Sequence, residues 1–583
     1  MIRRPPRSTP SNSSAASDVY KRQGLDLSDR DITITGFNPD DAGVVAETVL
    51  FDYDFVLTNV GPRTIIEGIT IQSGHMRIYS STPKIRNCNF IDSNWRGLDG
   101  DDGDGEDGFD GVSVLGGAVA MYDSSPEFKN CTFENCSVTG GDGGDGDDGN
   151  GGHPPGWDGG WAGRAYGGAV YAAWKSDPNF TDCTFTDCFA QGGNGGNGGD
   201  GYQGAHGGRG GNWVWSDSIE ASPYWLWWDG WMWGDKFDDY GWFYWFGWYD
   251  GSGLFPDPDP YDRYYDYWEY SGYGGAFFAE ADCNPRFNGC TFTNNRSYGG
   301  VCGIGGDGIP VPTPVRNMDI DTAGGAVFIS DGSHAEFSGC MIADNFSDTS
   351  TVDLPDNPYV SYGGGVACEK DSELAFVDCE VQGNEACLGG GVYWVDSDAM
   401  IEDCNVVGNV AYHGGGMYSS NSTGEIAGTF FTNNAASIAP TVEIGGDPNS
   451  GGSAGGTFAH SVFGRGGGYC ALSSPVNIAD SVFRGNQALA SGGGIFYVGS
   501  DQDNAVTPIL KNSLIVENTA GRDGGGISIN WFADPNIANC TISDNMVTGA
   551  IGAGFGYGGG IYVGYNSGAY ISDSIIWGNA GAN

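Results

Sequence analysis

The sequence is poor in basic residues and has no long uncharged apolar stretch. Lysine and arginine together number 25 against 74 aspartates and glutamates, which gives a formal net charge of −49 at pH 7. Because nucleic-acid binding depends on Lys and Arg to neutralise phosphates, this composition argues against a nucleic-acid partner. No run of about 18 uncharged apolar residues occurs, so no transmembrane helix is predicted. The acidity favours a solvated exterior in extracellular, cation-rich surroundings.

Helical periodicity is also missing. No apolar stripe with a period of about 3.6 residues occurs, and the 103 glycines disfavour helix along the chain. The apolar segments are short and rich in β-branched and aromatic residues. Turns with Asp, Ser, Gly or Pro separate them, as in Trp531-Phe532-Ala533-Asp534-Pro535-Asn536. The sequence therefore predicts an all-β protein.

A short phrase returns twelve times: a small residue, then Phe, Ile or Val two positions later, then usually Asn three positions after that. A clear copy is Cys290-Thr291-Phe292-Thr293-Asn294-Asn295. Each copy follows a second phrase, in which Gly-Gly precedes a short apolar strand, as in Gly390-Gly391-Val392. A period near 25 residues, seen from Cys379 to Cys404, indicates stacked structural repeats. The small residues are Cys88, Cys131, Cys183, Cys290, Cys340, Cys379, Cys404, Thr429, Ser481, Ser513, Cys540 and Ser574.

A unit of this size cannot bury its own apolar face, so we expect about 12 coils stacked in parallel, each strand pairing with its equivalents above and below. The small residue and the Phe, Ile or Val lie two positions apart and are predicted to face inward together. The Asn position is predicted to lie at a tight bend, where stacked amides hydrogen-bond along the rod. Ser93, Cys136 and Cys188 occupy it in the first three coils, and later coils have Asn295, Asn345, Asn384, Asn409, Asn434, Asn486, Asn518, Asn545 and Asn579.

These motifs resemble a known class of protein. The pairing of Gly274-Gly275-Ala276-Phe277 with Phe292-Thr293-Asn294-Asn295 looks like the right-handed parallel β-helices of secreted and surface bacterial proteins, and is similar to the repeats of the polymorphic outer-membrane protein family. The resemblance implies a right-handed parallel β-helix, or solenoid, and a location outside the cell or on the bacterial outer surface. It implies no single activity, since this fold carries lyases, hydrolases, esterases and adhesins.

We expect one β-helix domain over residues 24–583, interrupted by long Gly/Asp-rich and Trp-rich loop insertions. Residues 1–23 are basic and look like a translated sequencing adapter, so they are set apart from the fold. No capping element follows the last repeat, which predicts a fragment of a longer solenoid. The insertions are expected at 97–115, 139–166, 191–273, 298–323 and 348–362.

Eight of the 15 cysteines share the small-residue position of the repeat. Three interpretations stay open. The cysteines are buried free thiols that act as small apolar residues, or they form disulfides between neighbouring coils, or they bind a metal. The absence of any Cys-x-x-Cys pair disfavours the metal.

Three insertions carry Gly at every third residue, beginning at Gly97, Gly140 and Gly192. This spacing suits an extended left-handed helix with one crowded side. The three insertions are predicted either to pack together as a polyglycine-type bundle or to form flexible loops. The same segments partly match the Gly-Gly-x-Gly-x-Asp pattern of calcium-binding β-rolls. Candidate calcium ligands are Asp145, Asp148 and Asp200.

The segment 213–270 holds 24 aromatic residues among its 58, with Asp interleaved. Sugar rings stack their C–H faces on aromatic rings, and their hydroxyls bond to carboxylates, so this composition suits a glycan-binding platform. Two alternatives stay open: a lid that packs on itself, and a contact with a membrane interface or a partner protein. The candidate ligand-binding residues are Trp225, Trp227, Trp228, Trp231, Trp233, Trp242, Trp245 and Trp248.

The sequence shows none of the catalytic constellations expected of a β-helix enzyme. The Gly-His-Gly and Arg-x-Lys motifs of polygalacturonase-like hydrolases are absent, and adjacent Asp pairs lie in the Gly-rich insertions. The preferred prediction is a non-catalytic secreted or cell-surface protein with a structural or adhesive role. It would need no cofactor and would bind a polysaccharide or a cell-surface glycan through the aromatic insertion. The alternative is a polysaccharide lyase or glycoside hydrolase of the pectate-lyase-like β-helix class.

Overall fold

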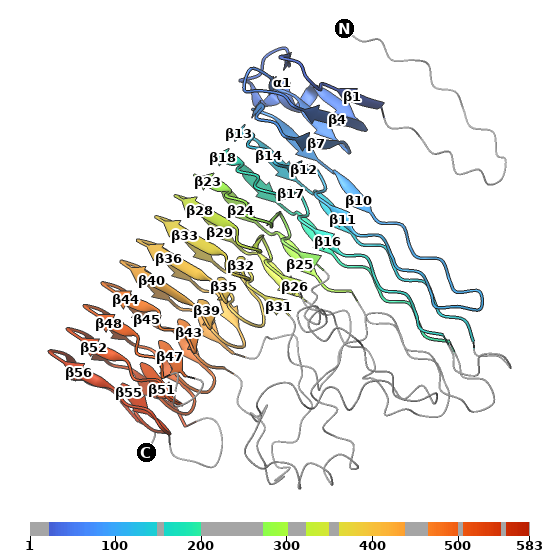
Figure 1. Cartoon of the computed structure of the whole chain (residues 1–583). Helices are drawn as coiled ribbons and strands as arrows, with labels where there is room; N and C mark the ends of the chain where they lie inside the picture. The colour runs from blue at the N-terminus through green and yellow to red at the C-terminus, as the bar shows by residue number, and fades with distance from the viewer. Residues whose placement is uncertain are drawn as a thin grey trace.

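The chain winds into a rod of short parallel strands (Figure 1). The computed structural model describes residues 23–148, 157–199, 272–300, 322–348, 361–437, 464–499, 505–549 and 556–581. Over these residues, each turn of the chain adds one strand to each of three 14-stranded parallel sheets, which we call sheets A, B and C. The one helix in the described part is α1 (Ala42–Glu47), where the Asp41 carboxylate accepts the N–H groups of Gly43 and Val44.

The strands of the three sheets are short because each is bounded by a bend. Sheet A contains β1 (Gln23–Asp26), β4 (Tyr53–Thr58), β7 (His75–Tyr79), β12 (Val119–Tyr122), β17 (Val170–Ala173), β22 (Phe277–Ala279), β27 (Val327–Ile329), β32 (Val366–Cys368), β35 (Val392–Val395), β39 (Met417–Ser420), β43 (Tyr469–Leu472), β47 (Ile495–Val498), β51 (Ile527–Asn530) and β55 (Ile561–Val563). Sheet B contains β2 (Thr33–Thr35), β5 (Ile65–Glu67), β8 (Lys84–Arg86), β13 (Glu127–Lys129), β18 (Asn179–Thr181), β23 (Arg286–Asn288), β28 (His334–Ser338), β33 (Glu373–Val377), β36 (Asp398–Glu402), β40 (Thr423–Ala427), β44 (Asn477–Ala479), β48 (Ile509–Lys511), β52 (Asn536–Ala538) and β56 (Tyr570–Ser572). Sheet C contains β3 (Val49–Phe51), β6 (Thr70–Gln72), β9 (Asn89–Ile91), β14 (Thr132–Glu134), β19 (Thr184–Thr186), β24 (Thr291–Thr293), β29 (Met341–Ala343), β34 (Glu380–Gln382), β37 (Asn405–Val407), β41 (Phe430–Thr432), β45 (Val482–Arg484), β49 (Leu514–Val516), β53 (Thr541–Ser543) and β57 (Ile575–Trp577).

The predicted parallel β-helix is confirmed, but the predicted number of coils is too low. Each main sheet has 14 strands, whereas the repeat phrase occurs twelve times. The first two rungs escaped detection because neither completes the phrase. Thr48 is followed by Leu50 and Tyr53 around β3, and Ile69 replaces the small residue before β6. Strand pairing in these rungs continues in register without the sequence phrase, so the fold tolerates its loss.

The core is built from columns of equivalent side chains. The predicted inward positions are confirmed, since the small residue and the apolar residue two positions on are both buried in eleven of the twelve copies. In the last described rung Ser574 is half-buried and Ile576 is exposed. Phe90, Phe133, Phe185 and Phe292 form one stack, with neighbouring ring centroids 4.8, 4.7 and 4.7 Å apart. These distances equal the spacing between strands, so in-register pairing places each ring directly on the next.

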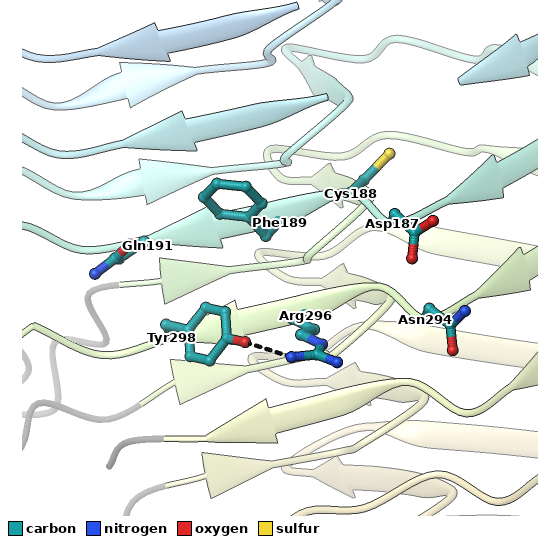
Figure 2. A pocket seen from close by; sticks show the side chains of 7 residues that line it. All are labelled: Asp187, Cys188, Phe189, Gln191, Asn294, Arg296 and Tyr298. Atoms are coloured by element: carbon teal, nitrogen blue, oxygen red, sulfur yellow. Dashed lines mark hydrogen bonds between the residues drawn. The ribbon is translucent and has the colours of Figure 1, made fainter. Parts of the chain in front are cut away.

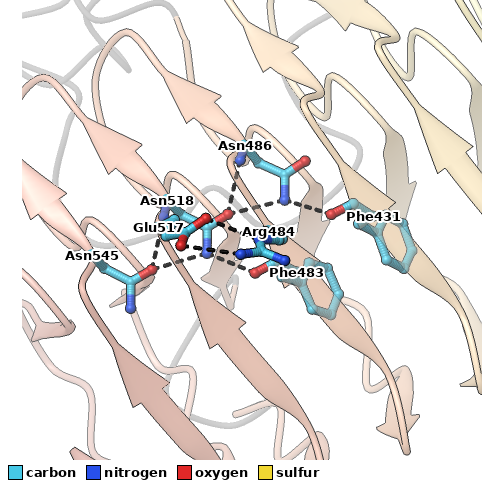
Figure 3. A network of polar contacts seen from close by, with 7 residues as sticks. All are labelled: Phe431, Phe483, Arg484, Asn486, Glu517, Asn518 and Asn545. Atoms are coloured by element: carbon cyan, nitrogen blue, oxygen red, sulfur yellow. Dashed lines mark hydrogen bonds and ion pairs between the residues drawn. The ribbon is translucent and has the colours of Figure 1, made fainter. Parts of the chain in front are cut away.

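A continuous ladder of asparagines lies at the bend that follows sheet C, as predicted. In Asn486 the side-chain Oδ1 accepts the backbone N–H of Asn434. Its Nδ2 donates to the Phe431 carbonyl (Figure 3). The same Nδ2 donates to Oδ1 of Asn518 in the next rung. This pattern links all nine asparagines from Asn295 to Asn579. Each amide thus replaces a hydrogen-bond partner that the bend removes from the backbone.

The fourteen cysteines in the described part of the chain are free thiols. In the ladder of small residues, the backbone N–H of Cys340 donates to Sγ of Cys379, and that of Cys379 donates to Sγ of Cys404, both at 3.4 Å. In the next rung, the backbone N–H of Cys404 donates to the Thr429 hydroxyl. The structure therefore favours the thiol interpretation over disulfides, and explains why Ser and Thr can replace Cys there.

A second ladder was missed by sequence reasoning. It lies at the bend between sheets A and B, where each serine hydroxyl accepts the backbone N–H of the rung before. Serines are frequent in this chain and their spacing varies with the insertions, so no fixed period revealed them. The members are Ser81, Ser124, Ser176, Cys283, Ser333, Ser372, Ser397, Ser422 and Ser474.

Between sheets C and A, five rungs extend outward as a two-layered wing. The outgoing layer is sheet D, with β10 (Asn94–Arg96), β15 (Ser137–Thr139), β20 (Phe189–Gln191), β25 (Arg296–Tyr298) and β30 (Phe346–Asp348). The returning layer is sheet E, with β11 (Val114–Leu115), β16 (Ala165–Tyr166), β21 (Gly272–Tyr273), β26 (Thr322–Ala323) and β31 (Ser361–Tyr362). In later rungs a sheet of two-residue strands takes the place of the wing. Its strands are β38 (Val410–Ala411), β42 (Ala435–Ala436), β46 (Gln487–Ala488), β50 (Thr519–Ala520) and β54 (Met546–Val547).

Of the two interpretations of the glycine-rich insertions, the structure favours packing as a bundle over their described parts, which lie side by side as long arms beyond the wing (Figure 1). We call these arms the glycine bundle. The first glycine of each triplet donates its N–H to a carbonyl of the next arm, as Gly100 does to Asp142. The second donates to a returning arm, as Gly144 does to Phe109. The N–H of the third residue donates to an Asp side chain of the arm before, as in Asp145 to Asp102.

This pattern explains the Gly-Gly-Asp triplet residue by residue. A Cβ at Gly144 would lie 2.0 Å from the Asp101 carbonyl oxygen, and one at Gly143 would lie 2.0 Å from that of Gly160. Both inner positions therefore require glycine, while the third requires a short side chain with an acceptor. At the edge of the bundle the second position is open, and Leu98 occupies it at 77% exposure.

Candidate functional site

Aromatic side chains gather on the outer face of sheet A near the start of the rod. Tyr79 of β7 and Tyr122 of β12 occupy the same position in adjacent rungs, and their rings stack with centroids 5.4 Å apart. Tyr171 and Trp174, both from the next rung, approach the Tyr122 ring to 5.6 and 5.3 Å. We call these four residues the sheet A aromatic surface, in which Trp174 is exposed, Tyr79 and Tyr122 are half-buried, and Tyr171 is buried beneath them. Alternation along the strands places them outward, because their neighbours Ile78, Met121 and Ala172 fill the core.

Trp174 is the most exposed member of this surface, at 66%. It lies in the turn after β17 with φ of 56°, in the left-handed region that Asn, Asp and Gly adopt most readily. The equivalent position one rung earlier is Asp123, with φ of 48°. A bulky residue in this conformation costs about 1–2 kcal/mol. Folding thus gains little from this tryptophan, which directs attention to its surface role.

A carboxyl group completes this surface. The Tyr171 hydroxyl donates a hydrogen bond to Glu280, which follows β22 in the next rung. Burial raises the pKa of the Glu280 carboxyl above its ordinary value, and the charge of Asp331 adds to the rise. Burial, together with the nearby Tyr79 and Glu280, raises the pKa of Tyr122 to about 12. The surface therefore places Tyr122 and Tyr171, each with a raised phenol pKa, beside a carboxyl that holds its proton more firmly than usual.

Further along the rod, the outer face of sheet A is covered. Sheet E folds back over it, and Tyr273 stacks on Phe328 at 5.5 Å while Tyr362 meets Tyr393 at 4.9 Å. Phe328 and Tyr393 are buried although they point away from the core. In the rungs of β7, β12 and β17, Tyr79 and Tyr122 stay partly accessible and Trp174 is exposed. A second exposed aromatic pair, Trp531 and Tyr565, lies in the turns at the other end of the rod.

A pocket lies on the wing, and we call it the wing pocket (Figure 2). Its volume is about 390 Å³. The walls come from two adjacent rungs, β20 and β25, together with the bends that precede them. They comprise Asp187, Cys188, Phe189, Gln191, Asn294, Arg296 and Tyr298.

Of the site residues predicted from the sequence, the structure describes only Asp145 and Asp148. The eight tryptophans from Trp225 to Trp248, and Asp200, lie outside the described residues. Asp145 and Asp148 lie in the glycine bundle, where Oδ1 of Asp145 accepts the N–H of Asn197. In the described ranges, no group of three His, Cys, Asp or Glu side chains is placed to hold a metal ion. Calcium binding stays a prediction.

The sheet A aromatic surface was missed, although a signal for it exists. In Gly117-Ala118-Val119-Ala120-Met121-Tyr122 and Gly168-Ala169-Val170-Tyr171, alternate residues after the glycines point outward. Aromatic residues at those outward positions are unexpected on a strand with one solvent face. Reading both repeats in register would have placed Tyr122 and Tyr171 on one surface.

Family comparison agrees with the topology. The sequence matches the model of a right-handed β-helix region over residues 267–438 and 364–576, which together span more than half of the chain. The chain belongs to the right-handed β-helix family. A comparison with curated proteins found no match. The likeness to polymorphic outer-membrane protein repeats rests on motifs alone and stays a prediction.

Solved structures with a similar right-handed β-helix include two epimerases. The periplasmic alginate epimerase AlgG has 8% identity and a TM-score of 0.36, with coverage of 95% of this chain and 85% of that one. The A-module of the Azotobacter vinelandii mannuronan C-5 epimerase AlgE6 has 8% identity and a TM-score of 0.28, with coverage of 96% and 91%. Among the described residues, no helix has the length and apolar character needed to cross a bilayer.

Replacing Glu280 by Gln is expected to change the pH dependence of stability. A carboxyl whose pKa is raised on folding destabilises the folded state once pH exceeds its ordinary pKa, so wild type loses stability above about pH 4.5. The variant lacks this loss, and its melting temperature relative to wild type should rise between about pH 4 and pH 7. Glu517→Gln is the control, because Arg484 lowers the pKa of Glu517. The melting temperature of this variant relative to wild type should fall, and not rise, as pH increases. Parallel pH profiles for wild type and Glu280→Gln would contradict the assignment.

Proposed function

We propose that this chain is a non-catalytic, secreted or cell-surface rod that binds polysaccharide through the sheet A aromatic surface. The observation that carries the proposal is Trp174, an exposed indole in a turn conformation that favours Asn or Asp. Aromatic faces bind the C–H faces of sugar rings, and a carboxyl group such as Glu280 hydrogen-bonds to hydroxyls. Stacked phenols along the rod axis suit an extended chain of sugars more than a compact ligand.

The location and partners follow from composition. The net charge of −49 supports an extracellular or bacterial outer-surface environment, where cations screen it. No cofactor is needed for binding of this kind. Calcium at Asp145, Asp148 and Asp200 remains an additional proposal, and the tryptophans from Trp225 to Trp248 would enlarge the same glycan-binding role.

Trp174→Asn is expected to separate binding from folding. The asparagine suits the left-handed turn, so stability should be unchanged or up to about 1 kcal/mol higher. Retention on insoluble polysaccharide should fall at least tenfold, because the most exposed ring is lost. The measurement is a pull-down of the full chain with a panel of neutral and acidic polysaccharides, beside thermal melting. Trp531→Asn is the matched control, because Trp531 has φ of 47° in the equivalent turn of a later rung and is 46% exposed. Equal retention of both variants would contradict polysaccharide binding by the sheet A aromatic surface.

One observation favours a second candidate function. The Tyr171–Glu280 pair places a carboxyl of raised pKa beside aromatic rings, which suits a general acid in a polysaccharide lyase or glycoside hydrolase. New reducing or unsaturated chain ends, measured in the same incubation, distinguish the two. Retention without new ends supports the binding rod, whereas new ends that disappear in Glu280→Gln support the enzyme.

A further inference from the structure

The wing pocket combines an arginine with aromatic rings in a chain that has few basic residues. Seven arginines of the described residues lie within 4.0 Å of a carboxylate: Arg63, Arg77, Arg86, Arg96, Arg286, Arg484 and Arg522. Arg296 is exposed, and its side chain forms a hydrogen bond of 3.0 Å from Nη1 to the Tyr298 hydroxyl. The Tyr298 hydroxyl orients this guanidinium without pairing it with a carboxylate, so its charge stays available to a ligand.

The neighbours of Arg296 in the register provide apolar surface on both sides. Phe189 precedes it in β20 and Phe346 follows it in β30, each at the same strand position. Both phenyl rings are half-buried, so each offers a partly accessible face. Gln191 and Tyr298 stand in the adjacent outward column of the same two rungs.

The rim of the pocket adds short polar groups. Asp187 and Asn294 lie at the bends before β20 and β25, with φ of 53° and 56°, so both side chains project from tight turns. Figure 2 shows them on one side of the pocket, with Tyr298 and Gln191 on the other and Arg296 between. Carboxylate, amide and phenol groups around an apolar floor are the usual partners of sugar hydroxyls.

We propose that the wing pocket binds a hexuronate unit of an acidic polysaccharide. The sugar carboxylate pairs with the Arg296 guanidinium, whose planar donors match a carboxylate. The C–H face of the ring lies against Phe189, and the hydroxyls bond to Asp187, Asn294 and Gln191. A volume of about 390 Å³ lies within the range of roughly 300–1,000 Å³ seen for small-ligand sites. This inference rests on the proposed polysaccharide binding and names its ligand as an acidic one.

The strong negative charge of the whole chain does not exclude an anionic ligand. At physiological ionic strength the screening length is about 8 Å, so charges far from the pocket contribute little. The nearest opposing group on the pocket wall is Asp187, whose charge also acts on Arg296. Pairing with Arg296 therefore makes the electrostatic interaction with an anionic ligand attractive, and repulsion from Asp187 limits its strength.

The test uses the full chain and two matched ligands, tetragalacturonate and its methyl ester, with affinities measured by calorimetry at about 0.15 M salt. Wild type should bind the acid at least tenfold more tightly than the ester. Arg296→Gln, which keeps a donor for Tyr298, should remove this preference while ester affinity stays within twofold. Asp187→Asn should strengthen acid binding severalfold. Arg286→Gln is the control, because Arg286 is exposed in the same rung but paired with Glu336 at 3.0 Å.

The outcomes separate this inference from the proposed function. Equal affinity for acid and ester, unchanged in Arg296→Gln, would overturn the wing pocket while glycan binding by the sheet A aromatic surface stands. Absence of binding to both ligands would also overturn the pocket, and retention on neutral polysaccharide then decides the proposed function. Loss of acid binding in Arg286→Gln as well as Arg296→Gln would mean that general charge, not the pocket, attracts the ligand.

Discussion

Replacing Asn409 by alanine is expected to destabilise the middle of the rod by about 3–5 kcal/mol, because it leaves buried groups without hydrogen-bond partners. Oδ1 of Asn409 accepts the backbone and side-chain N–H groups of Asn384, while its Nδ2 donates to the Val381 carbonyl and to Asn434. The residue is fully buried. Water therefore cannot replace the lost bonds without opening the coil.

The damage should stay local, because a solenoid rung contacts mainly its neighbours. Hydrogen exchange followed by mass spectrometry should show faster exchange in peptides that cover residues 379–411 and little change near residue 90. Asn405→Ala is the matched control, since Asn405 is an exposed residue of the same rung and should change stability by less than about 0.5 kcal/mol. If Asn409→Ala and Asn405→Ala melt alike, the ladder does not stabilise the bend.

Replacing Gly144 by alanine is expected to open the glycine bundle without unfolding the rod. The added Cβ would lie 2.0 Å from the Asp101 carbonyl oxygen and 2.4 Å from its carbon, and both are backbone atoms that no rotamer can move. The arms must separate, which exposes the N–H groups of Gly100 and Gly143 that now bond to neighbouring arms. Exchange of amides at residues 97–113 and 140–148 should accelerate at least tenfold, while peptides from sheets A to C keep their protection.

Two controls keep this result specific. Leu98→Ala changes a side chain at the same triplet position on the edge arm, where 77% exposure leaves space, and should preserve protection. Gly61→Ala tests glycine replacement itself, since no atom lies within 4 Å of a Cβ built there. If Gly144→Ala exchanges at the wild-type rate, the close packing of the arms is wrong.

The sequence predicted those parts of the fold that each rung repeats in the same chemical form. The Cys and Phe positions and the nine asparagines were placed correctly because burial and amide pairing restrict the residue at each of them. The first two rungs were missed because Leu50 and Ile69 fill the same apolar space without matching the phrase. The serine ladder was missed because hydroxyls serve many turns, so Ser81 or Ser422 carries no distinctive signal.

The candidate site was harder to predict than the fold. Composition directed attention to the tryptophans from Trp225 to Trp248, and that prediction stands untested outside the described residues. The sheet A aromatic surface and the wing pocket depend on register between rungs. Phe189 and Arg296, for example, are neighbours in space but 107 positions apart in the chain, because a long insertion separates β20 from β25. The register of the repeat phrase does place Phe189 and Arg296 side by side, one position after Cys188 and Asn295, but no pattern within either strand marks the pair as a site.

The triplet geometry of the glycine bundle constrains how its arms can change in length during evolution. Inserting one codon would move an Asp into a position where a Cβ meets a carbonyl oxygen, whereas adding three codons restores the same contacts one step further out. Length should therefore vary in steps of nine nucleotides, matched between an outgoing arm and its return. In the first insertion, the single break in the glycine rhythm lies between Gly103 and Gly108, at the tip where the chain reverses and Gly105 has φ of 80°. Only such tips are free to accumulate insertions and deletions of other lengths.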